Sequence, residues 1–189
     1  MSFFITEGNV VALLLMSLLI ALLLGLIVGG VNATLTQYVK LSPVIATIAT
    51  FGIVGGVALL LRPTAGGLID FNLMSLMTKK IGFIPLPLLI IIPLLFVADL
   101  VLWRSRFGLL VRAAGLEPVF AFRLGVNVNR MRVLSYIAAA VIASIAGILV
   151  AGQVGTGDGT VGNSYTLLAI AAPVLGGASL LGGRGSFVG

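Results

Sequence analysis

Long apolar runs dominate this chain, and short polar segments separate them. The first four runs cover Val10 to Val31, Val44 to Leu61, Leu86 to Trp103 and Val133 to Ala151. A helix of about 20 residues crosses the hydrocarbon core of a bilayer, so runs of this length can span it. The pattern therefore predicts an all-α polytopic membrane protein.

The fifth apolar run, Leu167 to Leu181, differs from the other four. It is short for a span, and Pro173 and the Gly176-Gly177 pair interrupt it. Irregular backbone at membrane depth is tolerated only where protein covers the freed polar groups. We therefore expect a discontinuous or re-entrant helix here, and about five transmembrane or re-entrant helices in all.

Small residues mark two faces of these predicted helices. Gly25 and Gly29 form a GxxxG pair, which either permits close helix contact or arises by chance. In the fourth run, small residues recur every four positions and predict a smooth stripe that packs on a neighbouring helix. The stripe consists of Ser135, Ala139, Ala143, Gly147 and Ala151.

The segments between the runs are read as linkers and loops. Val31 to Lys40 is expected to be a short polar linker, and Arg62 to Pro85 a loop with a turn at Gly66-Gly67. Part of that loop, Phe71 to Met77, could form a short surface helix. Gly152 to Asn163 is a second, glycine-rich loop.

Composition supports a membrane protein and excludes several kinds of chemistry. The chain is 60% hydrophobic and 8% charged, whereas soluble domains carry about 25% charged residues. It has no Cys and no His, which excludes thiolate sites and the commonest general base. Its five acidic residues are scattered and it has no phosphate-binding GxxxxGK[ST] motif. We therefore expect no enzyme activity, metal or cofactor.

The basic residues indicate an orientation. The net charge is +6, but the arginines and lysines sit at the ends of apolar runs, which argues against nucleic acid as a partner. One side would carry Lys40, Arg184 and the six arginines between Arg104 and Arg132. The other would carry Arg62, Lys79 and Lys80. The positive-inside rule makes the first side cytoplasmic.

The stretch from Arg104 to Arg132 is the predicted contact with another protein. Within it, Glu117 and Pro118 are helix start signals and Gly125 is a stop signal. This short segment carries Phe120 and Phe122, and aromatic residues anchor protein interfaces. The alternative is a connector whose phenylalanines rest on the bilayer.

Three parts of the sequence resemble permease subunits of bacterial ABC importers for ribose, xylose, galactose and related simple sugars. Gly30-Val31-Asn32 followed by Leu41 to Thr50 resembles GxxNG…LxPPFIATLGT. Ser105 to Gly108 and Gly125 to Arg130 resemble TRFG and GINVDR, and Ala169 to Ser186 resembles IAAVVLGGTSLxGGRGS. The resemblance implies a roughly ten-helix permease, so that residues 1–189 are expected to be one transmembrane domain, an internal portion of a longer chain.

The sequence departs from that family pattern in two places. The usual GGNxxAARLSGI is replaced by the segment from Gly115 to Val126, with Phe122 at the usual arginine position and Arg123 one residue later. The acidic pair of YELDAIAA is absent from the segment that begins at Tyr165.

The resemblance implies a subunit of an ATP-driven importer in the bacterial inner membrane. Its partners would be a cytoplasmic ATPase, a second permease, an extracytoplasmic solute-binding protein and the lipid bilayer. Residues 104–132 would form the cytoplasmic coupling loop. The coupling residues would be Gly115, Glu117, Phe120, Ala121, Phe122, Arg123 and Gly125.

The sequence says less about the solute and its pathway than about the partners. Weak pathway candidates are Asn32, Thr47, Thr50 and Tyr165, although the hydroxyls of Thr47 and Thr50 could instead bond the preceding helical turn. A simple sugar is the expected solute, and a branched-chain amino acid or another small polar solute is the alternative. A channel or secondary transporter without an ATPase is the alternative of a different class, but Asp99 is the only candidate ion relay in the runs.

Overall fold

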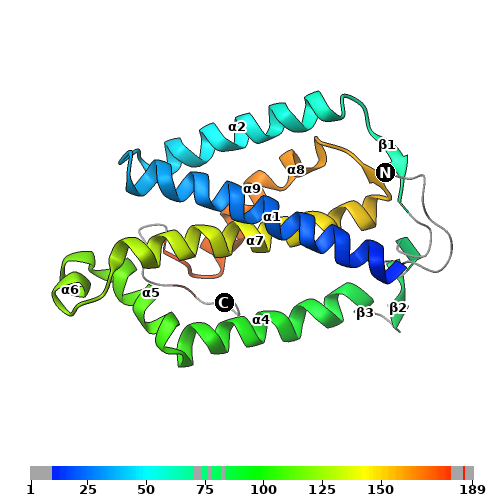
Figure 1. The fold of residues 1–189 in the computed structure, drawn as a ribbon. Coiled ribbons are helices and arrows are strands. Elements are labelled where there is room, and N and C mark those ends of the chain that lie inside the picture. The colour runs from blue at the N-terminus through cyan, green and yellow to red at the C-terminus, as the bar shows by residue number, and fades with distance from the viewer. Residues whose placement is uncertain (1–9, 70–73, 76–77, 82–83, 180–184, 186–189) are drawn as a thin grey trace.

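A computed structural model describes residues 10–69, 74–75, 78–81, 84–179 and 185. Four helices in this part of the chain are long and apolar enough to cross a membrane: α1 (Val10–Gln37), α2 (Pro43–Leu61), α4 (Leu86–Arg104) and α7 (Val128–Val154). Figure 1 shows that successive spans run in opposite directions between the two ends of the molecule. The predicted all-α polytopic fold is confirmed.

Two spans are longer than predicted. Helix α1 continues to Gln37, so the prediction of a polar linker from Val31 is wrong. The polar side chains there do not interrupt the helix, because Thr36 donates to the backbone carbonyl of Asn32 at 2.9 Å and so satisfies its hydroxyl internally. Helix α7 likewise starts at Val128, five residues before the apolar run that predicted it.

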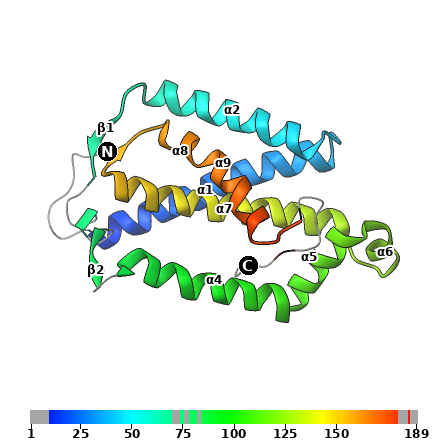
Figure 2. The same ribbon diagram turned by 180° about the vertical axis from the view of Figure 1, so that it is seen from behind.

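The last apolar run forms the short helix α9 (Thr166–Leu175), and the short helix α8 (Val161–Ser164) precedes it. The predicted glycine-rich loop from Gly152 is therefore partly wrong, because its first residues continue α7, Thr156–Gly157 form a strand, and α8 begins at Val161. Pro173 lies in the last turns of α9, and Gly177 follows with φ +83°, a conformation that glycine adopts without strain. In Figure 2, α9 stops well short of the end of the molecule that carries α6. A discontinuous helix is therefore confirmed.

Two small antiparallel strand pairs lie at the other end. β1 (Gly66–Leu68) pairs with β4 (Thr156–Gly157), and β2 (Lys80–Ile81) pairs with β3 (Ile84–Pro85). Gly66 and Gly67 thus belong to a strand and not to the turn that we expected. Of the expected surface helix, the described residues are Met74 and Ser75, both helical, and the rest lies outside the described ranges.

A tight turn follows β4. Asp158 Oδ1 accepts hydrogen bonds from the Thr160 backbone N–H and from its hydroxyl, each at 2.7 Å. These bonds favour the charged carboxylate, the backbone bond most, and they lower the pKa of Asp158 below its usual value. The turn orders the glycine-rich connection between α7 and α8.

The contact of α1 with α7 is the main helix packing in the described chain. A Cβ on Gly25 would lie 2.7 Å from the Cα of Val141, and a Cβ on Gly29 would lie 2.7 Å from the Cα of Ile137. The GxxxG pair is therefore a true close-contact site. The small-residue stripe of α7 is not a close-contact site within this chain. Ala139 and other members of the stripe stay exposed, because α7 turns the side that carries Ile137 and Val141 toward α1.

The remaining helices are loosely packed. The chain exposes 13580 Å², whereas a compact protein of this mass exposes roughly 8,500 Å². Large apolar side chains on the spans account for much of this, for example Leu60 in α2, which is 84% exposed, and Phe96 in α4, which is 59% exposed. These faces are suited to lipid or to other helices.

Candidate coupling surface

The two ends of the molecule differ in charge and structure. The short helices α5 (Arg106–Leu116) and α6 (Pro118–Arg123) lie at the same end as the connection from α1 to α2, which carries Lys40. The β1 and β2 strands, with Arg62 and Lys79 close by in sequence, lie at the opposite end (Figure 1). This arrangement agrees with the two sides that the basic residues predicted.

The corner between α4 and α5 depends on Ser105 and Gly108. The Ser105 hydroxyl accepts a hydrogen bond from the Gly108 N–H at 3.0 Å and caps α5. A Cβ on Gly108 would overlap the backbone of Leu102, so only glycine fits where α5 folds back against the end of α4. The motif that resembles TRFG therefore has a local structural role.

Arg112 connects the same two helices. Its guanidinium carbon lies 4.2 Å from the centroid of the Trp103 ring, a cation–π distance. Its Nη2 donates to the Trp103 carbonyl at 3.3 Å and its Nε to the Gly108 carbonyl at 3.4 Å. A side chain on α5 thus holds the last turn of α4.

Helix α6 starts and ends as the sequence predicted. Glu117 ends α5 and precedes α6, and Pro118 occupies the first turn, where its missing N–H costs nothing. At the other end, the Val126 N–H bonds to the Ala121 carbonyl and the Gly125 N–H to the Phe122 carbonyl, each at 3.0 Å. With Gly125 at φ +80°, this is a Schellman motif.

The two sides of α6 have different surroundings. Ala121 is 2% exposed and packs with Ala114 of α5 and Val128 of α7 in a small buried cluster. Phe120 and Phe122 on the outer side are 63% and 74% exposed. Of the predicted coupling residues, Ala121 is therefore an internal packing residue, and the phenylalanines are available to a partner.

The other predicted coupling residues surround this helix. Gly115, Glu117 and Arg123 are exposed, and Gly125 forms the turn that leads to α7. Leu124, which sequence reasoning did not single out, is 78% exposed beside the two phenylalanines. Phe120 and Phe122 lie on the two flanks of α6 away from Ala121, and Leu124 caps the helix. We call these three exposed apolar side chains, at the basic end of the molecule, the outer face of α6.

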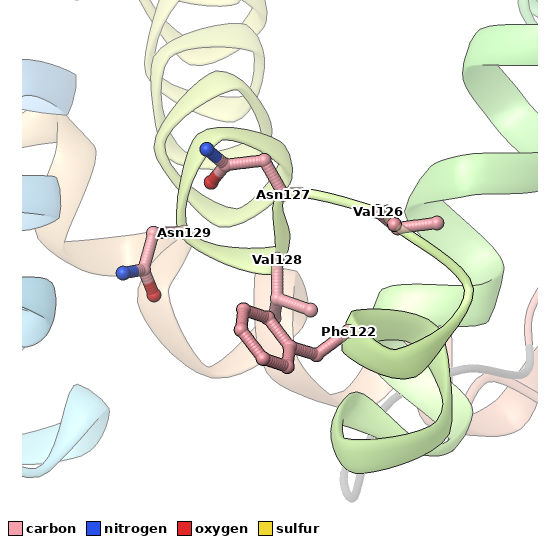
Figure 3. Close-up of a pocket in the computed structure, with 6 residues that line it drawn as sticks. Phe122, Val126, Asn127, Val128 and Asn129 are labelled. Atoms are coloured by element: carbon pink, nitrogen blue, oxygen red, sulfur yellow. The ribbon is translucent and has the colours of Figure 1, made fainter.

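A shallow depression of about 420 Å³ adjoins this face, between α6 and the first turn of α7. Figure 3 shows Phe122 reaching from α6 toward Val128, with Asn127 and Asn129 on the adjoining turn. Asn127 also caps α7, since its Oδ1 accepts from the Arg130 N–H at 3.1 Å. The depression therefore combines an apolar wall with amide groups. Asparagine is a common helix N-cap, so its position ahead of the fourth apolar run could have identified Asn127 from the sequence.

The four pathway candidates are not brought together as one site. The Thr50 hydroxyl lies 2.7 Å from Asn32 Oδ1, and these two buried residues join α2 to α1. The same hydroxyl also lies 3.0 Å from the Ala46 carbonyl of the preceding turn, the alternative that the sequence left open. Thr47 is exposed and its hydroxyl bonds the Pro43 carbonyl at 2.9 Å, as the alternative interpretation held. Tyr165, between α8 and α9, is 46% exposed.

Comparison with known proteins agrees with this architecture. The family model described as "Branched-chain amino acid transport system / permease component" matches residues 1–189. The chain belongs to this family. With four apolar helices, it is a multi-pass protein of the inner membrane, and the predicted permease family is confirmed.

Named relatives cover nearly all of the chain. It is 36% identical over 174 residues to a probable ABC transporter permease protein, y4mJ, of Sinorhizobium fredii, with 90% of this chain and 52% of the relative aligned. It is 37% identical over 177 residues to the autoinducer 2 import system permease protein LsrC of Yersinia pestis, with 92% and 50% aligned. The chain thus spans about half the length of these curated relatives. No solved structure matches it significantly.

Proposed function

We propose that this chain forms part of the transmembrane permease subunit of an ATP-driven importer, and that α6 is its contact with a cytoplasmic ATPase. The exposed apolar outer face of α6 carries the proposal. Phe120 and Phe122 stand on this helix and Leu124 at its C-cap, while Ala121 fixes the opposite side of the helix. Exposed aromatic residues on a rigid support fit a protein-binding surface better than they fit water.

The buried cluster explains how force on α6 would reach the spans. Ala121 joins α6 to α5 through Ala114 and to α7 through Val128. Helix α5 is fixed to α4 at the Gly108 corner, and α7 is packed on α1. A displacement of α6 would therefore move these helices as a unit, as expected when packed elements switch between two discrete arrangements.

The other parts of the importer follow from this assignment. ATP hydrolysis takes place in the separate ATPase, a second permease completes the pathway, and an extracytoplasmic binding protein delivers the solute. The buried Asn32–Thr50 pair is the best candidate in this chain for a polar contribution to the pathway, and Thr47 and Tyr165 are weaker. A simple sugar is the proposed solute, supported by the resemblance of Ala169 to Ser186 to sugar-importer permeases.

Single-cysteine crosslinking tests the proposed contact. The chain has no Cys, so Phe122→Cys introduces one unique thiol on the outer face of α6. We expect a crosslink from this thiol to the co-expressed ATPase. Thr64→Cys, between α2 and β1 at the opposite end, is the matched control and should give none.

Two results would contradict the proposal. One is the absence of a crosslink from both Phe120→Cys and Phe122→Cys when the ATPase co-purifies with the permease. The other is solute uptake that continues when the ATPase is deleted. Uptake of ribose compared with leucine by the same cells separates the simple-sugar assignment from the amino-acid alternative.

A further inference from the structure

The α4–α5 corner combines an exposed tryptophan with two exposed arginines. Helix α4 is a candidate span and ends at Arg104, so the corner lies where the hydrocarbon core ends. Trp103 is 53% exposed, and Arg104 and Arg106 are both exposed. Tryptophan and arginine at this depth are typical of contact with lipid headgroups.

One face of α5 continues this pattern. Arg106, Leu109 and Leu116 are spaced by three and seven residues, which places them along one side of the helix. Leu109 is 60% exposed and Leu116 is 55% exposed. Leucines beside arginines on a short helix after a span are characteristic of a helix that lies in the membrane interface.

The corner also has an ordered positive charge. Arg112 is held over the Trp103 ring at 4.2 Å and donates to the carbonyls of Trp103 and Gly108. Arg104 and Arg106 flank the same corner in sequence, and the carboxylates nearest in sequence are Asp99, one turn before Trp103 in α4, and Glu117, at the end of α5. The chemistry that complements this group is an anion at the membrane surface.

We propose that the α4–α5 corner binds the headgroup of an anionic phospholipid. Arg104 and Arg106 contact the phosphate, while Leu109 and Leu116 enter the upper acyl region. The site is separate from the outer face of α6, and it does not depend on the identity of the solute or the ATPase. Bound lipid would fix the corner through which α5 is joined to α4.

The single tryptophan allows a direct test, because Trp103 is the only one in the chain. The full chain is reconstituted in vesicles of phosphatidylcholine and phosphatidylglycerol, with brominated acyl chains on one lipid or the other. Bromine quenches a tryptophan that it touches. We expect stronger quenching by brominated phosphatidylglycerol at equal mole fraction, since each arginine near an anionic surface favours binding by about fivefold.

Matched variants locate the effect. Arg104→Gln with Arg106→Gln should remove most of the excess quenching, and the two arginine-to-lysine changes should keep most of it. The double variant Arg130→Gln with Arg132→Gln removes the same charge from α7 and should leave the excess quenching unchanged.

Equal quenching by the two lipids overturns the proposal, as does an excess that the Arg104 and Arg106 variants retain. Loss of the excess when phosphate replaces chloride at constant ionic strength would assign the site to free phosphate instead.

Discussion

At the scale of single residues, glycines fix the closest approaches in this molecule. Gly25 and Gly29 bring the backbone of α1 against Val141 and Ile137 of α7, and Gly108 does the same where α5 meets Leu102. A Cβ added at Gly30, next in sequence to Gly29, would meet open space, with no contact to another part of the molecule within 4 Å. Adjacent glycines in one helix therefore have different roles, which their spacing alone does not distinguish.

This contrast gives a matched pair of substitutions. Gly29→Ala should destabilise the protein by about 1–3 kcal/mol, because the new methyl group would overlap the α7 backbone. Gly30→Ala should be neutral or slightly stabilising, since alanine is the better helix former and meets open space. Thermal unfolding in detergent measures both. Equal effects of the two changes would contradict the α1–α7 packing described above.

At the scale of elements, the sequence predicted the spans and their order, and it predicted α6 closely. It placed the start of α6 within one residue, because Pro118 and Gly125 are strong local signals. It missed α5, whose residues have mixed polarity and no uninterrupted apolar run. It also missed β1 and β4, since a pair of two- or three-residue strands leaves no periodicity to detect.

The candidate site was partly predictable for the same reason. Phe120 and Phe122 were identified from residue type and position, and the structure places both on the outside of α6. Ala121 was assigned to the same contact, yet it faces inward because Ala114 and Val128 come from two other helices. Which side of a six-residue helix is covered depends on tertiary packing, and no local pattern reports it.

The α4–α5 corner gives an element-scale prediction. Gly108→Ala should displace α5 from α4, because the added methyl group would meet backbone atoms that cannot move aside. Since Arg112 lies over Trp103, this displacement should change the emission of the only tryptophan and weaken coupling of ATP hydrolysis to solute. Fluorescence of the purified protein measures the first effect.

Gly52→Ala is the control for this prediction. Gly52 lies in α2 with no atom within 4 Å of an added Cβ, so the emission should stay at the parental wavelength and intensity. An unchanged emission in Gly108→Ala would show that the corner tolerates a side chain, and would remove the structural reason given for that motif.

At the scale of the whole molecule, the described helices form an open array around the α1–α7 contact. Helices α2 and α4 expose apolar side chains along their lengths, and α9 ends partway between the two ends of the molecule (Figure 2). A surface this large and apolar is stable only against lipid or other helices. The side of the membrane that each end faces is then a matter of charge, and the positive-inside rule predicts that the end with the arginines near α5 and α6 faces the cytoplasm.

This orientation can be tested in intact cells, because the chain has no Cys to remove first. A membrane-impermeant thiol reagent added outside should label Thr64→Cys, near β1, and should fail to label Phe120→Cys on α6 until the cells are opened. Both side chains are exposed, so accessibility to water alone would not separate them. Labelling of Phe120→Cys from outside would place α6 on the outer surface. A cytoplasmic ATPase could not reach it there, and the proposed route from α6 through Ala121 to the spans would have no source of force.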